Sequence, residues 1–318
     1  MGIKNLLKNF PFVNGIVIKL KFSKYLFVYR KLMKNCAKGT QILIFPFEWT
    51  GDAIYIFSRL KSYLFKKGIM SSVCFVSSKK LQDIAQLFDI KTKLLVPSQM
   101  EALTRIAMVI GDVNRIKIMH HDPKYVYYNS ANKWCSLGNL DLGQVITQCV
   151  FDGLELEISS PLYRSSCGFS HNFNILPEKT VILAPCSYTL PNLPIAFWKK
   201  LAGKLLAEGY RVYFNLSDKE SNLYDIPSIN LSYTEILNFV EQCGFFIGVR
   251  SGLCDVIAFA QCYKIALYSN QCDQNQRNFF NLNRLWKHSN FIEIEYRYND
   301  DNLIDFILNK MSKKGEKK

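Results

Sequence analysis

The chain has 318 residues, and its 49% hydrophobic content is enough for two domains with substantial cores and too high for global disorder. It holds neither a run of about 18 apolar residues nor a secretory signal pattern, so we expect no spanning helix and no signal peptide. Most of the net charge of +14 lies at the ends: residues 1–47 hold nine Lys or Arg and no acid, and residues 308–318 hold five Lys and one Glu. The nearly neutral body argues against a nucleic-acid partner, because a protein that binds nucleic acid carries a stripe of basic residues across its binding surface.

The first predicted element, residues 17–34, carries apolar side chains on one helical side and lysines on another. A basic amphipathic helix of this kind can lie on an anionic membrane surface. It can also pack its apolar side on its own domain, and the two roles are compatible. The ten cysteines include no Cys-x-x-Cys pair, which suits reduced thiols in a cytoplasmic protein. We therefore expect a cytoplasmic protein that binds peripherally to the inner face of the membrane.

From residue 41 onward, short apolar runs alternate with segments of helical periodicity. The expected strands are 41–47, 71–78, 93–97, 115–121, 180–187, 210–216, 244–249, 263–269 and 291–296. This alternation predicts an α/β fold in which two Rossmann-like domains with parallel sheets face a central cleft. We expect an N-terminal domain over 1–170 and a C-terminal domain over 171–298. The helix of the last segment, 299–318, would cross back to the first domain before a basic tail.

A strand-to-helix turn with unusual chemistry follows residues 244–249, where the chain reads Arg250-Ser251-Gly252. The free N–H groups and the positive dipole end of a helix start favour an anion. Gly252 would let a phosphate come close, Ser251 would cap the helix and donate its hydroxyl, and Arg250 would offer a fixed charge to a diphosphate. The alternative is a capped turn in which Arg250 pairs with an acid.

Two further loops, one in each expected domain, also follow expected strands. The run VILAPCSYT (181–189) is followed by Pro194 and Trp198, and the first expected strand by Thr50-Gly51-Asp52. In the order and spacing of these motifs the chain resembles GT-B glycosyltransferases, most closely the heptosyltransferase-like group of glycosyltransferase family 9. The resemblance covers roughly residues 41–300 and implies a nucleotide-sugar donor in the second domain.

Three positions depart from that family's pattern. Pro191 stands where its donor-contacting Lys would fall, Arg250 replaces an Asp, and Asp255 replaces a His. The resemblance implies that Arg250 and Asp255 occupy donor-binding positions, with Arg250 as the substitute for the missing Lys. It leaves the identity of the sugar nucleotide open.

The candidate bases lie in the first domain. The resemblance implies a catalytic carboxylate at Asp52, beside acceptor-binding positions at Thr50 and Gly51. A carboxylate there can take the proton of an acceptor hydroxyl, or it can only cap the helix. His120 and His121 end the fourth expected strand, where an imidazole can act as a substitute base or remain a solvated loop residue.

The remaining candidates lie in the second domain. Ser187, Tyr188 and Thr189 follow its first strand and can donate to phosphate or ribose. Glu235 could hold ribose hydroxyls, or it could only complete a capping box with Ser232. Because no Asp-x-Asp pair stands at a strand end and no cysteine pair has zinc spacing, we expect neither a metal ion nor another cofactor.

These features predict an inverting, metal-independent glycosyltransferase. It would move a sugar from a nucleotide-diphosphate sugar to a cell-surface glycan or glycolipid, as in lipopolysaccharide or polysaccharide biosynthesis. Two alternatives stay open. One is a sugar-nucleotide epimerase of the same architecture, and the other is a basic membrane-peripheral binding module without catalysis.

Overall fold

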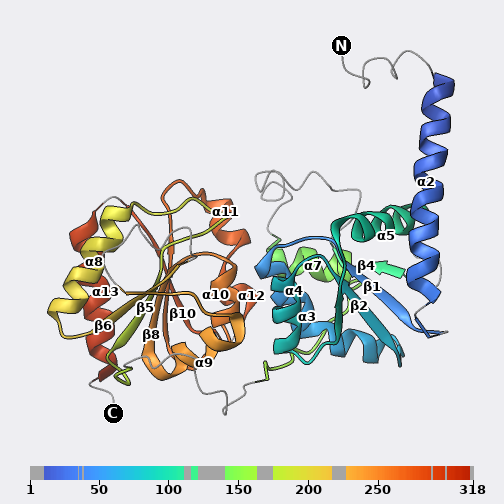
Figure 1. The fold of residues 1–318 in the computed structure, drawn as a ribbon. Helices are drawn as coiled ribbons and strands as arrows, with labels where there is room; N and C mark the ends of the chain where they lie inside the picture. Colours follow the sequence, from blue (N-terminus) through green and yellow to red (C-terminus); the bar gives the residue numbers. More distant parts are fainter. Residues whose placement is uncertain are drawn as a thin grey trace.

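The computed structural model describes residues 11–34, 36–37, 39–110, 116–120, 140–162, 175–216, 227–287, 289–297 and 299–315. Within these residues, two parallel β-sheets lie side by side, and helices flank each of them (Figure 1). The alternation of apolar runs and helical periodicity predicts this layering, because parallel strands need crossover helices that cover the sheet faces. The expected α/β fold with two Rossmann-like halves is confirmed.

The first sheet has the strand order β3-β2-β1-β4, with β1 in its interior. Residues 42–45 of β1 are completely buried, as expected for an apolar strand that is covered on both faces. The strands are β1 (Gln41–Phe45), β2 (Ser72–Val76), β3 (Thr92–Leu94) and β4 (Ile116–Ile118). The helices of this half are α2 (Pro11–Lys34), α3 (Thr50–Lys66), α4 (Lys79–Leu87), α5 (Pro97–Ile110) and α7 (Leu142–Val150).

The second sheet has the order β10-β9-β8-β5-β6-β7, so its connectivity reverses between β5 and β8. Ligands of doubly wound folds bind outside the carboxyl ends of the strands at such a reversal. The strands are β5 (Thr180–Ala184), β6 (Arg211–Asn215), β7 (Ser228–Ile229), β8 (Gly244–Val249), β9 (Tyr263–Tyr268) and β10 (Phe291–Glu295). The helices are α8 (Ile195–Ala207), α9 (Tyr233–Cys243), α10 (Gly252–Ile257), α11 (Gln274–Phe279), α12 (Leu282–Leu285) and α13 (Asp300–Gly315).

The N-terminal helix α2 is longer than the expected 17–34, and it lies against α5 on the side of the first domain away from the second (Figure 1). Its apolar side chains Tyr29, Leu32 and Met33 pack on the core of the first domain. Tyr25 donates a hydrogen bond of 3.0 Å to Glu101 on α5. Packing on its own domain, one of the two roles expected for this helix, is therefore present.

The last helix stays on the second domain. Leu303, Ile304, Ile307 and Met311 of α13 are buried in the same apolar cluster as Trp198 of α8, and α13 runs beside α8 on the far side of the sheet (Figure 1). The expected return of this helix to the first domain is wrong, because its apolar face is already covered by α8. The expected boundary near residue 170 falls in 163–174, outside the described residues.

The two halves share one apolar core where they meet. A single cluster of buried side chains includes Phe57 and Ile84 of the first domain and Phe239 and Ile257 of the second. Helix α3 contacts α10, α4 contacts α9, and α7 contacts α12. Burying apolar surface between domains fixes their relative position, so the loops at their facing edges form one site.

Candidate functional site

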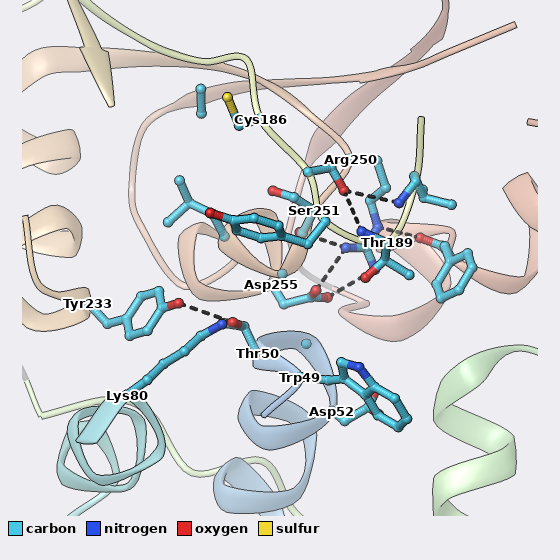
Figure 2. Close-up of a pocket in the computed structure, with 18 of the residues that line it drawn as sticks. Trp49, Thr50, Asp52, Lys80, Cys186, Thr189, Tyr233, Arg250, Ser251 and Asp255 are labelled. Carbon is cyan, nitrogen blue, oxygen red and sulfur yellow. Dashed lines mark hydrogen bonds and ion pairs between the residues drawn. The ribbon is translucent and has the colours of Figure 1, made fainter. Parts of the chain in front are cut away.

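A cavity of about 840 Å³ lies between the two domains, at the carboxyl ends of both sheets. Figure 2 shows side chains of both domains turned toward this space. Ten of the candidate residues from the sequence line it: Thr50, Gly51, Asp52, Ser187, Tyr188, Thr189, Arg250, Ser251, Gly252 and Asp255. The sequence therefore located the pocket, but several of the residues do not do there what their positions suggested.

The starts of α3 and α10 touch across the domain boundary. A Cβ atom added to Gly252 would lie only 2.5 Å from the Cβ of Thr50 and 2.9 Å from the backbone N of Gly51. A Cβ atom on Gly51 would lie 2.7 Å from Oδ2 of Asp255. Gly252 thus admits the backbone of the other domain, and the expected close approach of a phosphate to it stays a prediction.

Arg250 is buried and is held by the protein itself. Its Nη1 and Nη2 atoms donate to the two carboxylate oxygens of Asp255 at 2.8 and 3.2 Å. Its other hydrogen bonds go to the backbone carbonyls of Phe280 and Ser251, each at 2.7 Å. Four of its five N–H groups are engaged in these contacts. The ion pair considered as an alternative is present, which corrects the expectation of a guanidinium free to bind a diphosphate.

Asp255 is also fully held. Besides the two bonds from Arg250, its Oδ1 accepts a hydrogen bond of 2.9 Å from Nε1 of Trp286. Only 2% of Asp255 is exposed, so its carboxylate serves as the anchor for Arg250 and Trp286 inside the protein. A direct donor contact of Asp255 stays a prediction, and these bonds do not support it.

Ser251 occupies the N-cap position of α10 but does not cap it. The helix start shows no side-chain hydrogen bond from Ser251, and its buried Oγ has no hydrogen-bond partner among the described residues. The expected capping hydroxyl is therefore wrong. The residue lines the pocket while its Oγ is buried, so a contact of this hydroxyl with a donor stays a prediction.

Asp52 lies in the first turn of α3, where Trp49 holds the N-cap position. The alternative that Asp52 merely caps this helix is therefore wrong, although an acid in the first turn does suit the helix dipole. Burial and, to a smaller extent, the negative charge of Asp255 raise the pKa of Asp52 to about 7, against the opposing effect of Arg250. A carboxylate that titrates near neutral pH suits a general base.

In the loop after β5, one hydroxyl residue supports the loop itself and the next two face the pocket. The hydroxyl of buried Ser187 accepts hydrogen bonds from the backbone N–H groups of Thr189 and Leu190, at 3.3 and 3.2 Å. It therefore shapes the loop. The next two side chains, Tyr188 and Thr189, are exposed and line the pocket, so their hydroxyls can reach a ligand.

The remaining candidates lie outside the pocket lining. Glu235 forms the capping box with Ser232 at the start of α9, so the alternative weighed for it is confirmed. The ring of His120 lies 5.2 Å from Phe47 and 5.5 Å from Trp49, measured between centroids. Because Trp49 lines the pocket, His120 lies next to its wall. His121 lies outside the described residues, so its role as a base stays a prediction.

Several residues that line the pocket were not predicted from the sequence. The hydroxyl groups of Tyr233 on α9 and Thr50 of the other domain share a hydrogen bond of 3.1 Å. Asn215 and Asn230 lie at the ends of β6 and β7, and Lys80 lies in the first turn of α4. Asn215 and Lys80 lie at or just after the ends of expected strands, a signal that could have identified them. Strand β7 is only two residues long, so nothing in the sequence pointed to Asn230 or Tyr233.

No group of three or more His, Cys, Asp or Glu side chains in the described part of the chain is arranged to hold a metal ion. Among the same residues, no helix is both long and apolar enough to cross a lipid bilayer.

No protein-family model and no curated protein sequence is detectably similar to this chain. Solved structures are. The Escherichia coli ADP-heptose lipopolysaccharide heptosyltransferase II aligns with 87% of this chain and 100% of its own, at 12% identity and a TM-score of 0.59. A family 9 glycosyltransferase from Veillonella parvula aligns with 85% of this chain and 89% of its own, at 14% identity and a TM-score of 0.50.

A proposed UDP-N-acetylglucosamine 2-epimerase from Listeria monocytogenes also aligns, with 88% of this chain and 89% of its own, at 13% identity and a TM-score of 0.51. At such identities the likeness concerns the fold, which carries more than one chemistry. The arrangement of two facing parallel sheets is thus shared with all three proteins. The chain has the GT-B fold of the heptosyltransferases.

Proposed function

We propose that this protein is a glycosyltransferase that takes a sugar from a nucleotide-diphosphate sugar. The observation that carries the proposal is the position of Asp52. Asp52 is among the residues that line a pocket between two Rossmann-like domains, it is buried, and its pKa is raised to about 7. A base of this kind, facing the strand ends of a second domain, is what transfer to an acceptor hydroxyl requires.

The donor would lie on the second domain. Its wall offers the exposed hydroxyls of Tyr188 and Thr189 and the amides of Asn215 and Asn230. Hydroxyls and amides bind ribose and phosphate oxygens. The similarity in fold to an enzyme named for ADP-heptose supports a nucleotide-sugar donor. Arg250 would act by holding Asp255 and by setting the charge around Asp52.

The reaction would be a single displacement. Asp52 takes the proton of the acceptor hydroxyl while its oxygen bonds to the anomeric carbon, and the bond from that carbon to the diphosphate breaks. The nucleoside diphosphate leaves with the electron pair, and the anomeric configuration inverts. The uncharged hydrogen-bond donors on the wall of the second domain would stabilise the leaving group without a metal ion.

The acceptor would be a glycan or glycolipid at the inner membrane face. The basic first 47 residues favour an anionic surface, and Lys24, Arg30, Lys31 and Lys34 lie on α2. This part of the proposal places the enzyme in the cytoplasm, as a peripheral membrane protein.

Replacing Asp52 by Asn tests the proposal, because Asn keeps the shape and cannot accept the proton. Release of nucleoside diphosphate from the donor should fall by roughly 10²–10⁴-fold, while donor affinity stays unchanged. Unchanged turnover in Asp52→Asn would remove Asp52 from the chemistry. Product analysis separates the alternative enzyme: an altered sugar that forms in the absence of any acceptor would indicate an epimerase.

A further inference from the structure

Lys80 is a cation that lines the pocket and has no ion-pair partner in the described part of the protein. It lies in the first turn of α4, and its side chain extends from that helix toward Thr50 (Figure 2). Its ammonium group has neither a hydrogen bond nor an ion pair with any of the described residues. Its neighbour Lys79 is exposed and bridges to Asp83 at 3.1 Å.

Two physical effects oppose a charge at this place. A cation in the first turn of a helix meets the positive end of the helix dipole. Burial lowers the pKa of Lys80, against the attraction of Glu48, an exposed acid on the same wall. The attraction of Glu48 is smaller than the effect of burial. Local rules that are broken without full compensation mark functional positions, and an anion in the pocket would complete the compensation.

We propose that Lys80 binds an anionic group, a phosphate or carboxylate, on the acceptor. The assignment to the acceptor comes from its place, because Lys80 shares the wall of the first domain with Trp49 and Asp52. The residues proposed to bind the nucleotide-sugar donor line the opposite wall, on the second domain. This inference rests on the proposed function, since an acceptor exists only if the protein transfers a sugar.

Lys80→Met removes the charge and keeps most of the side chain, and Lys79→Met is its matched control one residue away. The probe is inorganic phosphate at constant ionic strength, and the readout is the melting temperature. Phosphate should stabilise the wild type and Lys79→Met with saturation. It should bind Lys80→Met at least about tenfold more weakly, the usual loss for a charge-assisted hydrogen bond. No saturable response in the wild type, or equal responses in all three, would overturn the proposal.

A second readout excludes a structural role. Without ligand, Lys80→Met should be at least as stable as the wild type, because it loses a half-buried charge that makes no hydrogen bond or ion pair with the described residues. A melting temperature clearly below those of the wild type and Lys79→Met would show that Lys80 supports the fold, and would overturn the proposal.

Nucleoside diphosphates separate the two sources of the anion. Their affinity should change by less than about twofold in Lys80→Met, and phosphate should still bind when the nucleotide is saturating. A tenfold loss of nucleotide affinity would move the anion to the donor and overturn the acceptor assignment. If phosphate binds through Lys80 while no nucleoside diphosphate binds, the proposed function fails and the anion site remains.

Discussion

The pair of Arg250 and Asp255 shows how far residue chemistry can be inferred from a sequence. The turn at 250–252 stands out as special because an arginine and a serine follow a buried strand. Its position at the pocket agrees with that interpretation. Asp255, the partner of the guanidinium, stands only five residues along the chain. Its carboxylate also accepts a hydrogen bond from Trp286, 31 residues away, and lies close to Gly51 of the other domain. No local pattern carries these two longer-range contacts.

The first prediction follows from this pair. Arg250→Ala leaves Asp255 buried without its partner, so the free energy of unfolding should fall by about 3–5 kcal/mol. Urea denaturation measures the loss. The double variant Arg250→Met/Asp255→Asn keeps an acceptor for Trp286 and removes both charges, so it should lose much less than the single variant. A loss below about 1 kcal/mol in Arg250→Ala would contradict the buried pair.

The second prediction concerns the titration of Asp52. Its pKa rises from 3.8 in the unfolded chain to about 7 in the folded protein, so the folded state binds the proton more tightly. The resulting stabilisation is complete below pH 3.8 and is lost as the pH rises toward about 7. By roughly 1.4 kcal/mol for each pKa unit, the loss amounts to about 4 kcal/mol.

The variant Asp52→Asn has no titrating group at this position, and it provides the comparison. The wild type loses the stabilisation from its protonated carboxyl as the pH rises, whereas the variant does not. The unfolding free energy of the variant should therefore rise relative to that of the wild type between about pH 4 and pH 7. Parallel stability curves over this range would contradict the raised pKa.

At the scale of elements, the contact between the starts of α3 and α10 decides how the domains meet. Gly252→Ala places a methyl group 2.5 Å from Thr50, and this overpacking should cost about 1–3 kcal/mol of unfolding free energy. Gly203→Ala is the control, since no atom lies within 4 Å of its added Cβ atom. Within α8 it should stabilise the protein by about 0.5–1 kcal/mol. Equal effects of the two changes in thermal denaturation would contradict the close contact.

Helix α2 gives a separate prediction about the membrane. It carries six basic residues, four of which are Lys24, Arg30, Lys31 and Lys34, whereas its apolar residues Tyr29, Leu32 and Met33 pack on the domain. Changing these four residues to Gln should weaken binding to anionic vesicles, at about 1 kcal/mol per charge, and leave the melting temperature unchanged. Vesicle co-sedimentation at two salt concentrations measures the effect. Undiminished binding would show that these charges do not hold the protein on the membrane.

Most elements were predictable because their periodicity is local. The strands expected at 41–47 and 244–249 and the capping box at Ser232 need only neighbouring residues. The contact of α13 with α8 and the short strand β7 were not predicted. Both depend on which apolar face remains uncovered once the second sheet has formed.

At the scale of the whole molecule, the shared apolar core holds the two domains with the pocket between them. The carboxyl ends of both sheets face this pocket, and in the proposed reaction a donor and an acceptor would meet there at Asp52. For this reaction the wall of the second domain must bind a nucleotide. Thr189→Trp would fill that wall from an exposed position, and it should abolish nucleotide binding without lowering the stability of the free protein.

The most direct test is a thermal-shift measurement with UDP, GDP, ADP, CMP and dTDP. A nucleotide at about 100 times its dissociation constant adds about 2.7 kcal/mol to the free energy of unfolding. We predict that at least one nucleoside diphosphate raises the melting temperature of the wild type by several degrees and leaves that of Thr189→Trp unchanged. If none of them shifts the wild type, while nucleic acid binds it in a salt-dependent manner, the account of a nucleotide-sugar transferase is contradicted.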